Sequence, residues 1–435
     1  MQNTSTVQYV IIGIFVVFIV IGIVIFAGFT GNSNSGSGGS VQVSVWGVIP
    51  ESAINNAVDK INTKAAGTVN ISYKQHPLAT FDNDLANAIA QGSGPDLVIL
   101  PESNLLKDNK LFVTIPYTAI PQRTFQDTFA SPASIFLTSK GITALPIIID
   151  PLVLYWNKDI FATAGVPTPP STWKDLTDLV PKLSNITTGK TILQSAISFG
   201  EYQNVKNAKE ILLTLFFQAG NPIIQLQNDN LINITYSGGS GDNQANLVES
   251  ALSFYTQFAN PSSVAYSWNR SLSNSDDMFL RGKSATYVGY ASEYPTLSSQ
   301  NPNLNFDVSV IPQASGTTNS VTYAKVYGVA IVNASKNQQS ALTNAEALVS
   351  SDFMGYFTDE TGLPSVRISQ LSAQNSNSAG EIFRRSILIG KDWLDPDPNS
   401  TNNYFQAMIE SVDNGSSNVS DAVRTFDLQI KELLK

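Results

Sequence analysis

The stretch LYWNKDIFATAGVPTPPSTWKDL, residues 154–176, says most about the fold. Its first residues form a β-rich run, and Asn157 is a good cap for a short helix that Gly165 would close. A loop with three prolines follows. Thr172 then precedes Asp175 by three residues, the spacing of a capping box at a helix start. The stretch therefore predicts a strand and two capped helices joined by an extended loop.

The chain before this stretch alternates between two periodicities. Strand-like runs with alternating or continuous apolar residues are separated by segments whose apolar residues have helical spacing. The order β-α-β-α-β predicts an α/β domain with a largely parallel sheet. The expected strands are 41–46, 69–75 and 95–100, and the expected helices are 51–65 and 81–92.

A second group of strands leads into the opening stretch. Segments 144–149 and 152–156 look like two strands that are broken at Asp150-Pro151, because proline cannot donate to a strand ladder. We interpret this break as a crossing point between two domains. Beyond it we expect helices at 207–220, 243–259, 344–362 and 422–434, strands at 306–312 and 327–333, and a helix leading into a strand within 276–290.

Composition excludes several classes of protein. The 435 residues contain no cysteine and one histidine, so thiol or histidine metal sites and cysteine nucleophiles are nearly excluded, and we expect neither metal nor cofactor. The lone His76 is interpreted as a packing or surface residue. The net charge is −9 and no basic run occurs, so nucleic acid is not an expected partner. The length suggests two domains plus an appendage.

The N-terminus predicts a membrane anchor. Residues 10–29 are all apolar or glycine, enough for a helix to cross a bilayer. A cleaved signal peptide is the alternative, but the run lacks a basic flank and a clean cleavage site. We expect a short tail (1–9), a single-pass anchor (10–29) and a flexible Gly/Ser linker (30–40) that holds an extracytoplasmic, monomeric body near the cell membrane.

Five segments in order resemble one family. The strand LPII precedes residues 154–176. After them come MFLRGKSATYVGY (278–290), YGVAIVN (327–333) with the helix that follows it, and TGLPSVR (361–367). This order resembles the extracellular solute-binding proteins of ABC importers, of the maltose- and oligosaccharide-binding type. The resemblance covers about Val41 to the C-terminus. It implies an α/β fold of two lobes joined by hinge strands, with a ligand in the cleft between them. Lobe 1 would hold 41–150 and 322–355, and lobe 2 would hold 151–321 and 356–435.

The resemblance also implies where ligand contacts lie. Aromatic rings would stack on the apolar faces of a sugar, and polar groups would bind its hydroxyls. Packing is the alternative for every aromatic candidate, and Tyr404 is an alternative to its neighbour Phe405. Trp173 is expected in the core, and packing is favoured for Trp268 and Trp393. Only Tyr155 and Trp156 of the opening stretch are placed to reach the cleft. The candidate ligand residues are Trp46, Glu51, Ser52, Asp150, Tyr202, Tyr290 and Phe405.

One departure from the family pattern bears on the ligand. Where maltose-binding members have an aromatic residue and a charged pair, this chain has LPESN at 100–104, which argues against maltose itself. The function implied is capture of a neutral solute, an oligosaccharide above all, for an ABC permease, without catalysis. A ligand sensor or adhesion module that acts through a membrane partner is the alternative. A glycan hydrolase is a third reading, but carboxylate pairs such as Asp276-Asp277 are better explained as solvated turn residues.

Overall fold

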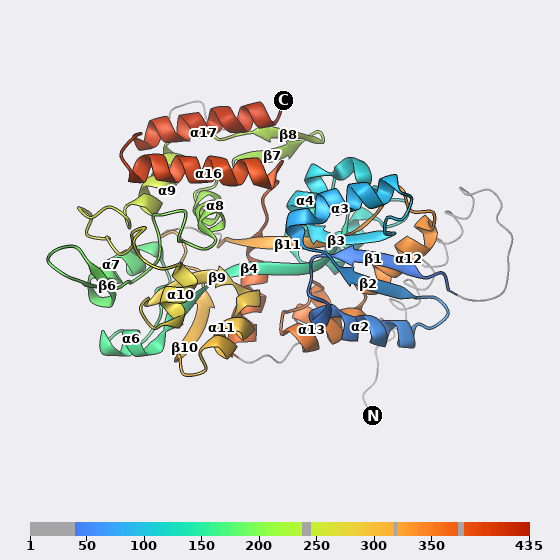
Figure 1. Ribbon diagram of the computed structural model, residues 1–435, viewed down its shortest axis with the longest axis horizontal. Helices are drawn as coiled ribbons and strands as arrows, with labels where there is room; N and C mark the ends of the chain where they lie inside the picture. Colours follow the sequence, from blue (N-terminus) through green and yellow to red (C-terminus); the bar gives the residue numbers. More distant parts are fainter. Residues whose placement is uncertain (1–39, 237–244, 317–319, 373–377) are drawn as a thin grey trace.

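The computed structural model describes residues 40–236, 245–316, 320–372 and 378–435. Its centre is an eight-stranded sheet with the strand order β10-β4-β11-β3-β1-β2, to which β12 and β9 add by pairing with β11 and β4. Figure 1 shows two bodies of helices, one on each side of the point where β4 and β11 cross from one to the other. The fold is thus a two-lobed α/β fold.

The first part of the chain forms the parallel sheet that its pattern predicts. β1 (Val43–Gly47) pairs in parallel with both β2 (Ile71–Gln75) and β3 (Leu97–Pro101). The helices α2 (Glu51–Lys64) and α3 (Leu78–Ala90) connect these strands. Every residue of β3 is buried, as expected for a strand covered on both faces. The β-α-β-α-β prediction is confirmed.

The expected break at Asp150-Pro151 is wrong, because β4 runs unbroken from Leu145 to Asn157. The strand changes partner at this point instead. Pro151 is the last residue aligned with β11, opposite Ala324, and Leu152 is the first aligned with β9 (Thr286–Tyr290). A residue without an N–H group is tolerated where one ladder ends and another begins. At the same point the strand passes from one hydrophobic cluster to another, since Ile149 belongs to the first and Leu152 to the second.

Two more segments pass between the lobes beside β4. β11 (Thr322–Ile331) runs antiparallel to β4 and to β3, and β12 (Gly390–Lys391) pairs with the start of β11. One hydrophobic cluster draws its residues from 43–149, 324–371 and Ile387; a second draws them from 152–311, Tyr323 and 393–430. These clusters are the cores of the first and the second lobe. A third, smaller cluster surrounds Tyr155 and Phe306.

The caps in the opening stretch are as predicted. The Asn157 side chain accepts hydrogen bonds at the start of α6 (Lys158–Thr163), and Thr172 with Asp175 forms a capping box on α7 (Trp173–Leu183). Trp173 is buried, which confirms it as a core residue. The helix expected at 344–362 is instead two helices, α12 (Gln338–Leu348) and α13 (Ser351–Thr361). They separate because the Ser350 side chain caps α13.

The remaining elements complete the two lobes, and residues 40–42 lead into β1. The other helices are α4 (Glu102–Lys107), η1 (Asn109–Leu111), α5 (Gln122–Thr128), η2 (Ser131–Phe136), α8 (Ala208–Gln218), α9 (Ala245–Thr256), α10 (Ser275–Leu280), η3 (Ala291–Glu293), α11 (Tyr294–Gln300), α14 (Ile368–Leu371), α15 (Ser378–Leu388), α16 (Pro398–Asp413) and α17 (Val419–Leu433). The other strands are β5 (Asn185–Ile186), β6 (Ile192–Gln194), β7 (Ile224–Gln227), β8 (Asn230–Asn233) and β10 (Phe306–Val310).

The expected anchor at 10–29 and the linker up to residue 39 lie outside the described residues. Within the part of the chain that is described, none of the helices combines the length and the apolar character that crossing a membrane requires.

Close packing around Gly328 gives a first prediction. A Cβ atom on Gly328 of β11 would lie 2.6 Å from Ala144 Cβ and 2.7 Å from Phe136 Cζ. Gly328→Ala should therefore lower the free energy of unfolding by about 1–3 kcal/mol. Gly355→Ala is the matched control, because α13 has room there, with Gln370 as the nearest neighbour at 3.9 Å. It should raise stability by about 0.5–1 kcal/mol. Chemical denaturation measures both, and two changes of equal sign would contradict the packing described.

Candidate ligand-binding site

Polar side chains meet on one face of the sheet where β4 and β11 cross between the lobes. Lys325 lies directly opposite Asp150, and Tyr327 lies opposite Ile148. Directly opposed residues point to the same face, and so do alternate residues along a strand. Tyr290 joins this face because it lies opposite Leu152, two residues after Asp150. We call these five residues, Ile148, Asp150, Tyr290, Lys325 and Tyr327, the junction face.

The junction face is partly open although it lies in the middle of the sheet. Within β11, only Lys325 and Tyr327 are half-buried, and every other residue is buried. In β4 the same is true of Ile148 and, near the far end, Trp156. The helices of the two lobes thus cover these strands on both sides but leave the crossing point accessible. That geometry suits a small-molecule site between two bodies.

Lys325 and Tyr290 contact each other on this face. The Lys325 ammonium lies 4.7 Å from the centre of the Tyr290 ring, a cation–π arrangement. Tyr290 is buried, and its hydroxyl oxygen has no hydrogen-bond partner within the described residues. Its backbone carbonyl accepts a hydrogen bond from the Tyr155 hydroxyl at 2.6 Å. The backbone of Tyr290 is therefore held in place, while its hydroxyl still offers one unused polar group.

Buried acids surround the lysine. Asp150 accepts a hydrogen bond from the Ser292 N–H at 3.0 Å, and burial raises its pKa to about 6. Asp392 follows β12 and accepts from the Val326 N–H at 2.8 Å; burial raises its pKa to about 7. Burial also raises the pKa of Glu102, which starts α4 in the first lobe. These acids therefore hold protons readily, which lowers the local negative charge.

The second lobe contributes polar groups from α8. Glu210 in the first turn of this helix interacts electrostatically with Tyr290, Lys325 and Tyr202. Burial disfavours the charge of Lys325, yet Tyr327, Glu210 and nearby acids raise its pKa, so it remains an ammonium group. Lys209, the preceding residue, is already paired, because its ammonium lies 2.6 Å from the Asp395 carboxylate. Lys325, by contrast, interacts electrostatically with Glu210, Asp150 and Asp392 together.

Two of the expected ligand residues lie on the junction face, and a third shares an electrostatic partner with one of them. Asp150 and Tyr290 belong to the junction face. Tyr202 lies nearby, half-buried in the loop before α8, and burial raises its pKa to about 12. Tyr202 and Tyr290 both interact with Glu210. One acid thus connects the two tyrosines.

Three other candidate ligand residues do not belong to the junction face and lie at the carboxyl ends of β1 and β2. Trp46 is half-buried and stacks on His76, with ring centres 3.9 Å apart and an angle of 21° between the planes. Glu51 and Ser52 are exposed in the first turn of α2, where Glu51 accepts a hydrogen bond from the Gln75 N–H at 3.1 Å. His76 is thus a packing partner of Trp46, one of the two roles expected for this histidine.

Phe405 has no exposed surface, so packing explains it. It lies in the second core with its ring 4.9 Å from Phe426 and 5.7 Å from Trp393. Trp393 and Trp268 are buried as well, in line with the packing interpretation.

The two aromatic residues of the opening stretch are also packed. Tyr155 is fully buried, and Trp156 is half-buried against Phe161, with the ring centres 5.1 Å apart. Neither belongs to the junction face, so the stretch that best predicts the fold contributes no side chain to this site.

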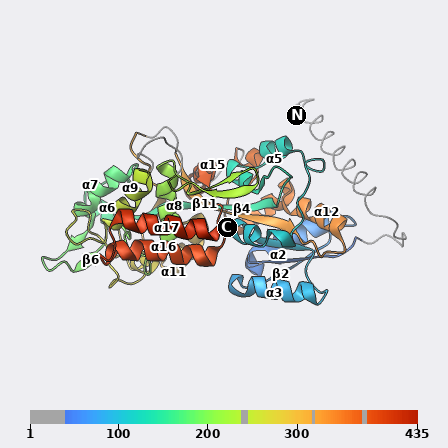
Figure 2. The ribbon, with the colours of Figure 1, turned by 90° about the horizontal axis from the view of Figure 1, so that it is seen from above.

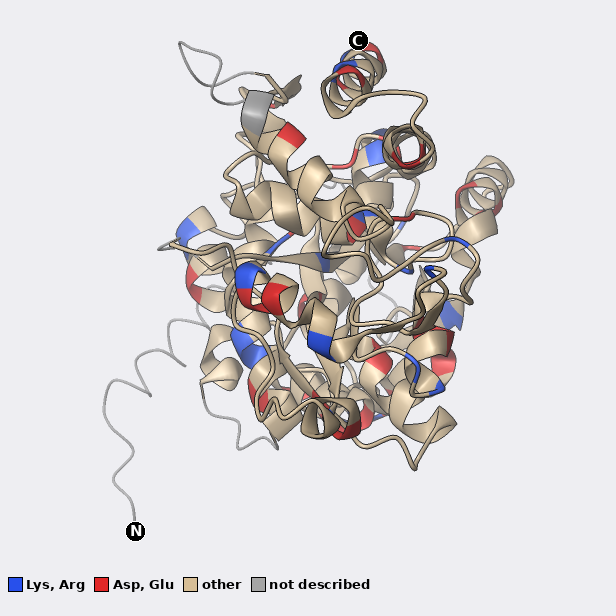
Figure 3. Ribbon diagram, turned by 90° about the vertical axis from the view of Figure 1, so that its left-hand side faces the viewer, with Lys and Arg blue, Asp and Glu red and all other residues tan. Residues whose placement is uncertain are grey.

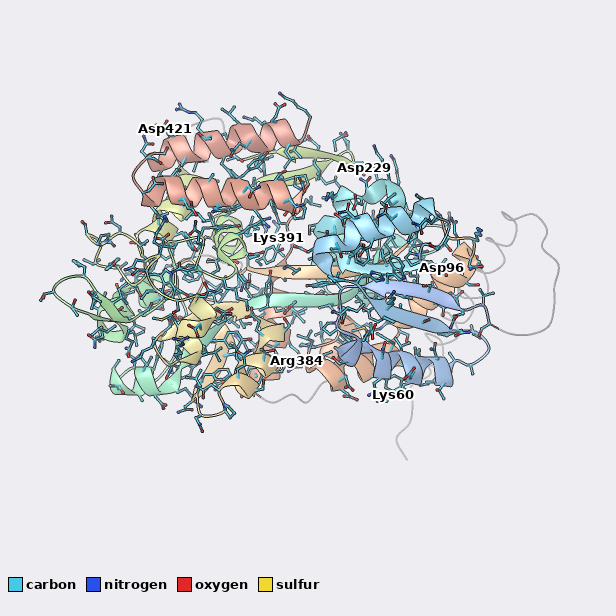
Figure 4. All side chains as sticks on the ribbon, in the orientation of Figure 1. Lys60, Asp96, Asp229, Arg384, Lys391 and Asp421 are labelled. Atoms are coloured by element: carbon cyan, nitrogen blue, oxygen red, sulfur yellow. The ribbon has the colours of Figure 1, made fainter. Side chains whose placement is uncertain are left out.

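A cavity of about 680 Å³ borders the junction beside β12. Its walls come from η2 of the first lobe, from β7 of the second lobe and from the crossing segment that contains Lys391 and Asp392. Figure 4 labels Lys391 between the two lobes. Asp392 thus lines this cavity and interacts electrostatically with Glu102 and Lys325.

Sequence reasoning missed Lys325, Tyr327, Asp392 and Glu102. A signal for the first two was present, since a tyrosine, a lysine and a tyrosine alternate at 323, 325 and 327 in an otherwise apolar strand. A single charged residue at an inward-facing position of a buried strand indicates that its side chain has a functional or structural partner. Asp392 and Glu102 follow strands by one residue, a position that the pattern alone does not distinguish from a turn.

Outside the junction face, positively and negatively charged side chains are mixed. Figure 3 shows lysine, arginine, aspartate and glutamate interspersed on the second lobe among many uncharged residues, without a basic stripe. No group of histidine, aspartate and glutamate side chains suitable for holding a metal ion occurs among the described residues. The arrangement is one for binding through aromatic faces and hydrogen bonds.

The raised pKa of Asp150 predicts a pH-dependent effect on stability. In the unfolded chain this carboxyl ionises near its ordinary value of 3.8, whereas in the fold it ionises near 6. The fold therefore loses stability as pH rises through this window, by at most about 3 kcal/mol. Asp150→Asn keeps the acceptor for Ser292 but cannot ionise. It should melt above the parent at pH 8 and show no such gain below pH 4.

The control is Asp127→Asn on the exposed surface of α5, which should follow the parent at both pH values. Melting curves across pH 3.5–8 give the comparison. A constant offset between Asp150→Asn and the parent would contradict the burial of an ionising group.

Comparison with known proteins shows which family and which solved structures resemble this chain. A model of the family described as bacterial extracellular solute-binding protein matches residues 56–379. A Brucella abortus protein that carries the name of a binding protein is 23% identical over 302 residues, which cover 68% of each chain.

Two solved structures show how much of the fold is shared. The cyclic alpha-maltosyl-1,6-maltose binding protein of Arthrobacter globiformis is 16% identical, with a TM-score of 0.74 over 91% of this chain and all 100% of its own. An ABC transporter solute-binding protein of Thermotoga lettingae, bound with alpha-D-tagatose, is 19% identical, with a TM-score of 0.65 over 91% and 100%. The family match extends over most of the chain and places the folded body outside the cytoplasm. This chain is a binding protein, not an enzyme, and it belongs to the bacterial extracellular solute-binding protein family.

Proposed function

We propose that the chain is the substrate-binding protein of an ABC importer and that it binds a neutral solute, an oligosaccharide, at the junction face. The observation that carries the proposal is the partly open face of Tyr327, Lys325 and Asp150 between two lobes. Tyrosine rings can stack on the apolar faces of a sugar. Lysine and carboxyl groups can bind its hydroxyls through charge-assisted hydrogen bonds. The two solved structures named above also carry sugar ligands in their descriptions.

The proposed ligand residues combine both sources of information. Asp150, Tyr202 and Tyr290 are retained from the sequence prediction, and Lys325 and Tyr327 are added from the structure. Trp46, Glu51 and Ser52 stay as proposed contacts from the first lobe, because the carboxyl ends of its parallel strands are where ligands bind in open α/β sheets.

The division into lobes supports a proposed hinge. We place lobe 1 at 41–150 and 322–372, and lobe 2 at 151–321 and 378–435. The later boundary lies beyond the expected residue 355 because α13 packs on α2 and Phe357 belongs to the first core. β4, β11 and the segment at β12 then form the hinge. A ligand that contacts both lobes favours the closed arrangement by its differential affinity.

One contact outside the hinge also joins the lobes. The hairpin of β7 and β8 extends from the second lobe, with Asn228 and Asp229 in left-handed conformation at its tip. Asp229 accepts a hydrogen bond from the Ser139 N–H at 2.8 Å and a second from its hydroxyl. Figure 4 shows Asp229 near the helices of the first lobe. Any hinge motion must keep or break this contact.

The proposed cellular setting follows from the N-terminal segment. Residues 10–29 are proposed as a single-pass anchor and 30–40 as its linker, with a monomeric body that passes its ligand to the permease. Tethering would raise the concentration of the binding protein near the transporter.

A ligand screen tests the proposed function. The full chain should melt at a higher temperature with an oligosaccharide than without it. Binding to the native state alone adds about 2.7 kcal/mol when the ligand is 100-fold above its Kd. Thermal melts against mono- and oligosaccharides, amino acids, peptides and polyamines provide the measurement. A shift with a peptide or polyamine but with no sugar would reject the carbohydrate assignment while leaving a solute-binding role.

Replacing Tyr327 tests the location. Tyr327→Ala should weaken sugar binding about tenfold or more, because it removes the accessible aromatic surface of the junction face. Tyr356→Ala is the matched control, since Tyr356 is also half-buried and beside a lysine, with Lys60 5.3 Å from its ring, but lies on α13. Calorimetric titration measures the sugar affinity of each variant relative to the parent. Equal affinities for the two variants would move the site away from the junction.

A further inference from the structure

A separate cavity lies within the first lobe. It has a volume of about 380 Å³ and lies between α5 and α12. Figure 2 shows both helices in the same lobe, on the right of the view. No residue of the junction face contributes to its wall. The wall is mainly apolar, with Ile120, Phe125, Phe129, Leu145, Leu342 and Val349 among its residues.

One charged side chain stands in this apolar wall. Arg367 donates from Nη1 to the Val349 carbonyl at 2.8 Å, and its guanidinium carbon lies 5.7 Å from the centre of the Phe129 ring. Its Nε atom is buried and has no hydrogen-bond partner among the residues that the structure describes. No aspartate or glutamate of the described ranges forms an ion pair with it, whereas Arg270 and Arg384 pair with Glu201 and Glu381.

A structural role explains only part of this arrangement. The bond to Val349 ties Arg367 to the end of α12, and the Phe129 ring supports the guanidinium. Neither contact uses Nε. A partly buried guanidinium without a counter-charge is unfavourable, and burial lowers the pKa of Arg367 accordingly. A bound carboxylate would supply the missing charge and accept from the guanidinium fork.

A second polar group lines the same cavity. Gln339 on α12 has a buried side-chain oxygen without a partner. A glutamine amide can present either its oxygen or its NH2 group, so it can bind one oxygen of a carboxylate. Glu346, also on α12, lines the same cavity; the residue is exposed, yet partial burial of its carboxyl raises its pKa. Its charge opposes an anion near the entrance.

We propose that this cavity is a second binding site, for a small amphiphilic monocarboxylate. Its apolar body fills the space between α5 and α12, and its carboxylate pairs with Arg367. The site is independent of the junction face and of the solute bound there. A neutral apolar occupant would fit the apolar wall but would leave the guanidinium uncompensated, and the experiment separates the two.

The test compares an acid with its neutral amide. The full chain in phospholipid nanodiscs is titrated calorimetrically with 3-phenylpropionate and with 3-phenylpropanamide, and empty nanodiscs are subtracted. We expect the acid to bind about tenfold more tightly than the amide, since hydrogen bonds to charged groups are the stronger ones. Equal binding of the two, tighter binding of the amide, or heat from neither overturns the proposal.

Three variants locate the effect. Arg367→Gln should abolish the preference for the acid. Arg384→Gln is the matched control, because Arg384 also has a buried, unpartnered Nε but lies in α15 (Figure 4), and it should bind like the parent. Glu346→Gln removes the negative charge that lines the cavity and should tighten binding of the acid about twofold, a modest effect because the residue is exposed.

The third variant keeps the test valid if Arg367→Gln does not fold. Three outcomes would overturn the proposal. Both arginine variants could lose the preference for the acid, Arg367→Gln could bind the acid like the parent, or Glu346→Gln could bind the acid more weakly than the parent. An oligosaccharide found in the screen should leave the affinity for the acid unchanged, and competition between them would place both ligands in one site.

Discussion

The crossing of β4 and β11 between two hydrophobic cores is the constraint on which the rest of the structure depends. Each strand is buried in one core at one end and in the other core at its other end. Between the cores, Ile148, Lys325 and Tyr327 on one face of the sheet remain only partly buried, beside the buried Asp150 and Tyr290. Charged groups can remain at such a point if they compensate one another, and Lys325 lies opposite Asp150 in the strand register. The same two strands thus join the lobes and present the polar face.

Local signals in the sequence predicted most of the elements. The caps at Asn157 and Thr172 depend only on neighbouring residues, and the parallel strands of the first lobe have strong apolar periodicity. The two errors arose where a tertiary contact decides the outcome. A proline breaks a strand only where the ladder needs a backbone N–H donor at that position. At Pro151 the partner of β4 changes from β11 to β9, so no donor is needed there. The division of residues 344–362 into α12 and α13 depends on a single cap, Ser350, within a continuous apolar pattern.

The site was less predictable than the fold because register between distant strands is absent from the sequence. Asp150 and Tyr290 could be named from the family resemblance, as each lies in a recognisable segment. Lys325 and Tyr327 acquire meaning only when β11 is aligned with β4. Phe405 shows the opposite case: an aromatic residue at a plausible position turns inward, because α8 and α17 pack on both sides of it. Aromatic residue type alone therefore does not separate stacking platforms from core residues.

Electrostatics separates the two cavities of interest more clearly than shape does. At the junction, the buried acids Asp150, Asp392 and Glu102 lie near the Lys325 ammonium, and burial raises the pKa of each, so that they lose negative charge more readily as pH falls. A neutral ligand rich in hydroxyls can use carboxyl groups as either donors or acceptors under these conditions. In the first lobe the relation is reversed, since Arg367 stands in a mainly apolar wall and forms no ion pair with an acid of the described residues, although Glu346 lines the same cavity. The anion site proposed in the first lobe and the neutral-solute site proposed at the junction therefore differ in charge, as expected for two independent sites.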